Sequence, residues 1–207
     1  MKFVSLDLET STLKPGPYNI LSMALVFHSD FRTPVEGLPS LRILFTAAPT
    51  DTSNIAMAMN APILLAIEAA RQNRATIDPK WASLVPGDTF TRAEQELKQT
   101  THVCYDQGDA VNIIRDWLKD VSPSGKKLAL AGKNIGTFDW QFLTDSIRGL
   151  FSHRTIDPGS LYLASTDELP PDTAECCRRA GLSDKVTHSA YDDAKQVVEL
   201  VRAALIV

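Results

Sequence analysis

The hydrophobic positions of this chain fall into short apolar runs near the N-terminus and into amphipathic stretches further on. Three apolar runs joined by short turns predict strands at 2–8, 20–28 and 41–46. Later segments switch between helix and strand periodicity. They predict helix 109–119, strand 127–131, helix 138–150, a short strand at 155–156, and helices that begin at Asp172 and Ser189. This order indicates an α/β fold in which helices cover both faces of a mixed sheet.

The middle of the chain, residues 47–105, interrupts this alternation and has the character of an insertion. Residues 54–72 and 90–99 predict helices, and residues 73–88 between them form a polar, proline-containing loop. Two interpretations remain open at this stage. The segment either selects the substrate or shields an edge of the sheet.

The composition fits a globular protein, which we expect to form one domain over residues 1–207. Of the 207 residues, 44% are hydrophobic and 22% are charged, which suffices for one buried core. The three cysteines show neither a disulfide framework nor zinc-ligand spacing, and neither a signal peptide nor a membrane span is visible. These features predict a cytoplasmic protein without a membrane partner. The net charge of −4 argues against binding nucleic acid mainly through a basic surface.

An Asp-x-Glu triplet at the end of the first strand is the first candidate for chemistry. Residues two apart on a strand point to the same face, so Asp7 and Glu9 present their carboxylates side by side. Such a pair repels unless a divalent cation neutralises it, and hard oxygen ligands suit Mg²⁺ or Mn²⁺. Taken alone, the triplet is more typical of a solvated strand end with two unrelated acids.

Two further segments carry residues of the same chemical type. Asp139 follows the strand 127–131 and a turn with two glycines, so it is expected at a helix start, on a face open to solvent. Asp193 lies in an apolar-periodic helix, and His188 immediately precedes that helix. Taken individually, Asp139 is an ordinary acid at a helix N-terminus, and His188 is an ordinary loop histidine.

Together, the five residues Asp7, Glu9, Asp139, His188 and Asp193 resemble, in order and context, the motifs of the DEDDh 3′-to-5′ exonucleases. This family includes proofreading subunits, ribonuclease T and oligoribonuclease. The resemblance implies a ribonuclease-H-like fold and two divalent ions, Mg²⁺ or Mn²⁺. It also implies that Asp7 bridges both ions, that Glu9 and Asp193 complete the first site, and that Asp139 holds the second through water. His188 would be the general base.

The resemblance extends to the substrate, which would be DNA or RNA with a free 3′ end, expected to be single-stranded. Leu13 would press against the terminal base, Phe138 would line the same pocket, and Asn134 would contact the substrate. Lys133 stands where relatives often have histidine, and the spacing from Asn134 to Asp139 follows the oligoribonuclease pattern. The products would be nucleoside 5′-monophosphates.

Several alternatives remain open from the sequence. The chain could be a phosphodiesterase for dinucleotides or very short oligonucleotides, or a catalytically inactive module of the same fold that holds nucleic-acid ends or a protein. An inactive module predicts the loss of at least one of the five residues, and all five are present. The choice between DNA and RNA depends on contacts to the 2′-hydroxyl. A homodimer and a polymerase partner both stay open.

Overall fold

The computed structural model describes residues 1–184 and 187–205. Within them, one mixed sheet contains β1 (Phe3–Thr10), β2 (Ile20–His28), β3 (Ser40–Phe45), β4 (His102–Cys104), β5 (Ala129–Ala131) and β6 (Thr155–Ile156). The strands lie in the order β4-β3-β2-β1-β5-β6. β1 is therefore an interior strand, antiparallel to β2 and parallel to β5.

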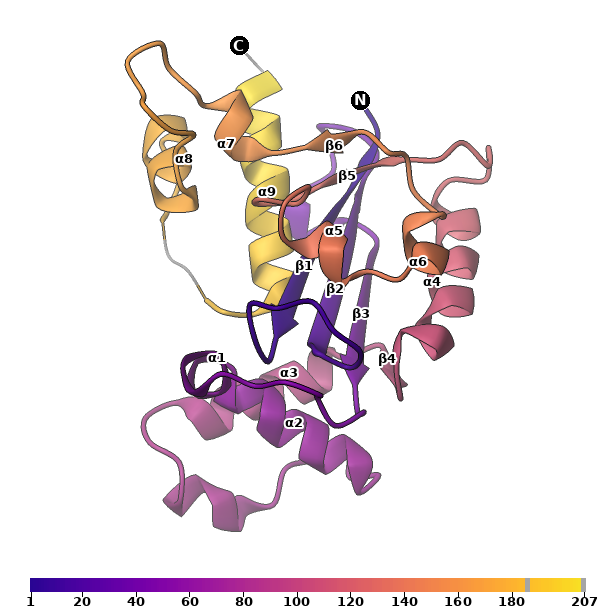
Figure 1. The fold of residues 1–207 in the computed structure, drawn as a ribbon, viewed down its shortest axis with the longest axis vertical. Helices are drawn as coiled ribbons and strands as arrows, with labels where there is room; N and C mark the ends of the chain where they lie inside the picture. Colours follow the sequence, from indigo (N-terminus) through magenta and orange to yellow (C-terminus); the bar gives the residue numbers. More distant parts are fainter. Residues whose placement is uncertain (185–186, 206–207) are drawn as a thin grey trace.

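The helices divide into those that cover the sheet and those that lie at one end of it (Figure 1). They are α1 (Asn54–Met59), α2 (Ala61–Arg71), α3 (Thr89–Gln99), α4 (Gln107–Val121), α5 (Asp139–Phe142), α6 (Asp145–Arg148), α7 (Pro158–Leu161), α8 (Thr173–Ala180) and α9 (Ala190–Leu205). Short 3₁₀ helices span Val35–Gly37 and Pro79–Ser83.

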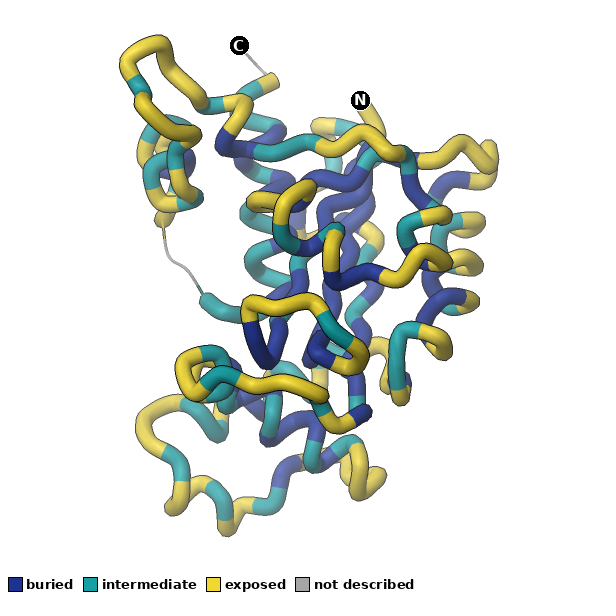
Figure 2. Tube along the Cα trace, in the orientation of Figure 1, coloured by how far each residue is buried: buried dark blue, intermediate teal, exposed yellow. Residues whose placement is uncertain are grey.

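Both faces of the sheet are covered by clusters of packed apolar side chains, as the sequence pattern predicts. On one face α9 packs its apolar stripe, which includes Ala194 and Val198, against Phe3 and Val26 of the strands. On the other face α4 and the short helices α5 and α6 cover a larger cluster around Leu6. Figure 2 shows the central strands buried and the outer loops exposed. The sheet is therefore the rigid layer from which side chains at its end project.

The segment 47–105 forms a small helical layer beyond the end of β1 (Figure 1). Helices α2 and α3 pack on each other, and Ile63 and Ala66 of α2 contact Leu21 and Leu44 at the ends of two strands. The edge of the sheet beyond β3 is occupied by β4, which pairs with it in parallel. The helices of the segment therefore cap the end of the sheet, and its last strand, β4, extends the sheet beyond β3.

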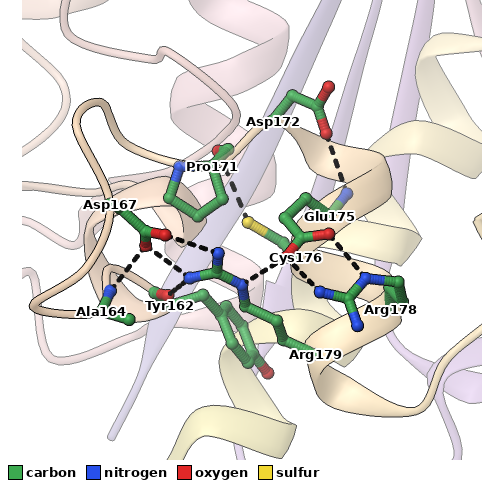
Figure 3. A network of polar contacts seen from close by, with 9 residues as sticks. All are labelled: Tyr162, Ala164, Asp167, Pro171, Asp172, Glu175, Cys176, Arg178 and Arg179. Atoms are coloured by element: carbon green, nitrogen blue, oxygen red, sulfur yellow. Dashed lines mark hydrogen bonds and ion pairs between the residues drawn. The ribbon is translucent and has the colours of Figure 1, made fainter.

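Helix α8 is fixed by a network of polar contacts around Arg179 (Figure 3). The Arg179 guanidinium donates to both carboxylate oxygens of Asp167 at 2.5 and 2.7 Å, to Glu175 at 2.7 Å and to the carbonyl of Tyr162 at 2.7 Å. These bonds tie the connection from α7 to the helix. Asp172 caps its first turn by accepting from the Glu175 amide at 2.8 Å.

Most predicted elements are confirmed within a few residues, but the helices predicted over 54–72 and 138–150 are each divided in two, and β4 and α7 were not predicted. The helix predicted over 138–150 is broken into α5 and α6, because Leu143 and Thr144 adopt extended backbone. The Gln107 side chain explains the break: it donates to the Phe142 carbonyl at 2.9 Å and accepts from the Thr144 amide at 2.8 Å. Strand β4 has only three residues, too few for a periodic signal, and was not predicted.

Candidate metal centre and active-site cleft

A cleft of about 700 Å³ opens at the end of β1, between the sheet and the helical layer of residues 47–105. All eight side chains predicted for the site line it: Asp7, Glu9, Leu13, Asn134, Phe138, Asp139, His188 and Asp193. The strand end, the turn after it, the start of α5 and the start of α9 supply these residues. Segments far apart in the sequence therefore meet in one place.

Three carboxylates form the floor of this cleft. Asp7 and Glu9 project from the same face of β1, as the pleat requires, and Asp193 comes from the first turn of α9, which packs against β1. One oxygen from each lies within 4.8 Å of the others. Oxygen donors converging at this separation can hold a divalent metal ion.

The electrostatics of the metal-free cluster support this interpretation. Burial, together with the neighbouring carboxylates, raises the pKa of Asp7 well above its usual value. Burial and the charge of Asp193 raise the pKa of Glu9 to about 8. The pKa of Asp193 is also raised, chiefly by burial. A divalent cation would remove this cost by stabilising the ionised carboxylates, so the residues present fit a metal ion.

Asp139 begins α5 as predicted, but the expectation that it faces solvent is wrong. Its side chain lies in the cleft and the residue is only 3% exposed. Burial raises its pKa to about 7, although backbone hydrogen bonds at Asp139 and Leu8 lower it. Asp139 interacts with Asp7 electrostatically without belonging to the three-carboxylate cluster.

His188 occupies a tight turn immediately before α9. Its φ of 52° lies in the left-handed region, which is unusual for a residue with a side chain. The preceding Thr187 donates from its hydroxyl to Asp193 at 3.2 Å, and its carbonyl accepts from Arg92 of α3 at 2.5 Å. His188 therefore lines the cleft from a segment that Asp193 contacts on one side and Arg92 on the other.

The rim of the cleft is apolar, in contrast to its floor. Leu13 is 77% exposed, and Phe138 packs its ring on Phe142 at 5.0 Å between centroids. Across the cleft, α1 contributes Ile55, which is 76% exposed, and Met59. Exposed apolar side chains around a polar floor are typical of a ligand-binding surface.

Asn60, between α1 and α2, is a site residue that the sequence reasoning read only as part of a helix start. It lines the cleft at 4% exposure and donates to the Thr10 carbonyl at 3.0 Å. Its amide also hydrogen-bonds the Glu9 carboxylate and lowers the pKa of that group. Its Oδ1 atom is buried without a hydrogen-bond partner. The only sequence signal was a polar residue inside an apolar helical stretch.

Tyr191, close to His188 in sequence, lies away from the cleft. Its ring packs under the guanidinium of Arg42, 3.5 Å from the ring centroid, and beside Lys195.

The three cysteines are free and buried. None of the helices in the described part of the chain combines the length and apolar character that crossing a bilayer requires.

No protein-family model and no curated protein matches this sequence. Among solved structures, the crystal structure of cell-death related nuclease 4 matches with a TM-score of 0.53 and 9% identity over 97% of this chain. The chain spans 62% of that nuclease chain. At this identity the likeness concerns the fold, and it confirms the predicted α/β ribonuclease-H-like architecture.

Proposed function

We propose that this chain is a metal-dependent 3′-to-5′ exonuclease of the DEDDh type. The observation that carries the proposal is the convergence of Asp7, Glu9 and Asp193 in one cleft that Asp139 and His188 also line. The resemblance of the sequence motifs supports the same function, and so does the fold shared with cell-death related nuclease 4. The reaction is hydrolysis of the last phosphodiester bond, which releases a nucleoside 5′-monophosphate.

The carboxylates have distinct roles in this proposal. Asp7, Glu9 and Asp193 would hold one divalent ion, and Asp139 together with Asp7 would hold a second. Mg²⁺ and Mn²⁺ suit a site made only of carboxylate oxygens. When bound, the ions supply Lewis-acid stabilisation of the charge that develops on the phosphate and on the departing 3′ oxygen.

His188 acts as the general base. A neutral ring nitrogen accepts the proton of the attacking water while the water oxygen bonds to phosphorus and the bond to the 3′ oxygen breaks. The adjacent Asp193 lies close enough to His188 for the two side chains to interact electrostatically, so the proposed base and a proposed metal ligand are neighbours in the cleft. The held turn keeps the ring pointing into the cleft.

The apolar rim selects the end of the strand. Leu13 and Phe138 contact the terminal base by stacking and shape, and Ile55 and Met59 close the opposite side. Asn134, exposed at the cleft, contacts the backbone of the terminal nucleotide. Such contacts recognise any base, so the proposed enzyme trims 3′ ends without sequence preference.

End-labelled oligonucleotides test this function. Matched DNA and RNA oligomers, single- and double-stranded, carry a 5′ label and are incubated with Mg²⁺ or Mn²⁺. A ladder that shortens from the 3′ end, nucleoside 5′-monophosphate products and inhibition by chelator are expected. Undiminished turnover in excess chelator, or products carrying a 3′-phosphate, would contradict the proposal.

A phosphodiesterase for very short substrates is the second candidate. Among the residues that line the cleft, the lysines are Lys14 and Lys133, which offers little positive charge to a long phosphate backbone. Comparison of turnover on a dinucleotide and on a 20-residue single strand separates the two. Binding of oligonucleotides without any turnover would instead favour an inactive end-binding module.

A further inference from the structure

Helix α3 of the segment 47–105 contacts the turn that carries His188. Arg92 donates from Nη2 to the Thr187 carbonyl at 2.5 Å, across 95 positions of sequence. One turn further along α3, Glu96 lines the same cavity as Ser189; burial raises the pKa of the Glu96 carboxylate and the Ser189 side chain lowers it. Both neighbours of His188 therefore face the same helix.

The contacts continue from this turn to the carboxylate floor. The Thr187 hydroxyl donates to Asp193 at 3.2 Å, so the residue whose carbonyl Arg92 holds also contacts a proposed metal ligand. His188 itself adopts a φ of 52°, a conformation that costs energy unless surrounding contacts maintain it. The turn therefore depends on external support.

Helix α3 is a suitable support because it is anchored independently of the turn. Ala93, next to Arg92 in sequence, is fully buried, and Leu97 packs against the apolar clusters formed with α2. Arg92 is half-buried, and a polar cavity of about 370 Å³ that it shares with His188 separates α3 from the start of α9. The guanidinium bridges the two sides of this cavity.

We propose that Arg92 is a positioning residue that holds the Thr187–Ser189 turn so that His188 points into the cleft. The inference rests on the proposed function and deepens it, because it assigns to the segment 47–105 a role in the chemical step. Arg92 does not need to touch the substrate in this role.

The test replaces Arg92 with Gln and with Lys and measures hydrolysis of a 5′-labelled single-stranded oligomer in Mg²⁺. Arg92→Gln should lower kcat about 10- to 100-fold while KM stays within about twofold. Arg92→Lys keeps a donor and the charge, so it should recover part of the loss. Arg71→Gln is the matched control, since Arg71 also donates to a backbone carbonyl, that of Thr46 at 2.9 Å, but lies outside the cleft.

A double-mutant cycle separates positioning from general destabilisation. If Arg92 acts through His188, adding Arg92→Gln to His188→Ala should cost less than about a further twofold. Equal losses in both backgrounds, a loss confined to KM, or no loss at all would overturn the inference. If Arg92→Gln does not fold, Arg92→Lys is judged by the same criteria.

An NMR measurement that does not depend on enzymatic activity distinguishes failure of the positioning role of Arg92 from failure of the proposed exonuclease function. The chain has four histidines, so the His188 imidazole signal in an NMR spectrum is assigned by its loss in His188→Ala. The signal should shift or broaden in Arg92→Gln and remain unchanged in Arg71→Gln. An unchanged signal in Arg92→Gln overturns the positioning role, whereas a wild-type protein without nuclease activity overturns the proposed function instead.

Discussion

At the scale of single residues, each carboxylate of the cleft has two opposing effects. It supplies an oxygen ligand, and in the metal-free protein it repels its neighbours. Asp7→Asn should therefore abolish activity in Mg²⁺ and Mn²⁺ while leaving the metal-free melting temperature no lower than that of wild type, since burial and three nearby acids already disfavour the Asp7 charge. Hydrolysis assays and calorimetry in chelator measure the two effects.

Asp116→Asn provides the matched control for this substitution. Asp116 is an exposed acid on α4 that pairs with Lys119, so its loss should leave activity unchanged. A strong fall in the melting temperature of Asp7→Asn would show that Asp7 also has a structural role, and activity that persists in this variant would remove it from the metal site.

His188 and Tyr191 lie three positions apart, but the structure separates their environments. His188→Ala should reduce kcat by about two to four orders of magnitude with little change in substrate affinity. Tyr191→Phe should be mild, because the Tyr191 ring packs under Arg42 outside the cleft. Single-turnover rates of the two variants provide the comparison, and equal losses would contradict a general-base role for His188.

Residue patterns predicted which side chains meet, but not how deeply they are buried. The pleat placed Asp7 and Glu9 on one face, and the structure agrees. The periodicity placed Asp139 at a helix start but gave no sign of its burial, because burial depends on β1 and on the short length of α5. Thr187 carries no sequence signal for a site, and Asn60 is marked only as a polar residue in an apolar stretch, since their contacts are made across the fold.

At the scale of secondary-structure elements, local periodicity failed where a distant side chain competes with the helix. The stretch 138–150 has helical spacing, yet Gln107 takes the carbonyl and amide that would continue α5 into α6. A residue more than thirty positions away cannot be recognised as a helix breaker from the stretch itself.

Helix α1 contributes the apolar side chains of Ile55 and Met59 to the lining of the cleft, where they are expected to contact the substrate. The double substitution Ile55→Ala and Met59→Ala should raise KM for single-stranded oligomers several-fold with kcat nearly unchanged, because these side chains offer contact area and no chemistry. Steady-state kinetics measure the change. Leu84→Ala, an exposed apolar residue of the same segment that does not line the cleft, is the control. A fall in kcat without a change in KM would contradict this role.

At the scale of the whole molecule, the site is assembled from both ends of the chain. Asp7 lies in β1 and Asp193 in α9, and the packing of that helix on the sheet brings them together. The order of motifs therefore predicted the fold class, and the carboxylates that it singled out meet in one cleft. The contacts of the segment 47–105 to the end of β1 and to the His188 turn were not predictable, because they depend on how a helical layer docks on the sheet.

The crowded cleft also makes the stability of the whole protein depend on pH and on metal. Glu9 and Asp139 have pKa values raised to about 8 and about 7. Because these values exceed those of the unfolded chain, the stabilisation by the protonated carboxylates is complete below about pH 4 and is lost as the pH rises through the folded values. The metal-free melting temperature should therefore fall by a few degrees between pH 6.5 and pH 8.

Mg²⁺ or Mn²⁺ should oppose this fall, since a bound cation stabilises the ionised carboxylates and binds only the folded protein. The thermal shift produced by metal should accordingly be larger at pH 8 than at pH 6.5, and it should be much reduced in Asp7→Asn. Thermal unfolding in chelator and in saturating metal at both pH values measures this difference. A metal-free melting temperature that rises over this interval, or an equal metal shift in wild type and Asp7→Asn, would mean that the carboxylates of the cleft do not form the metal site.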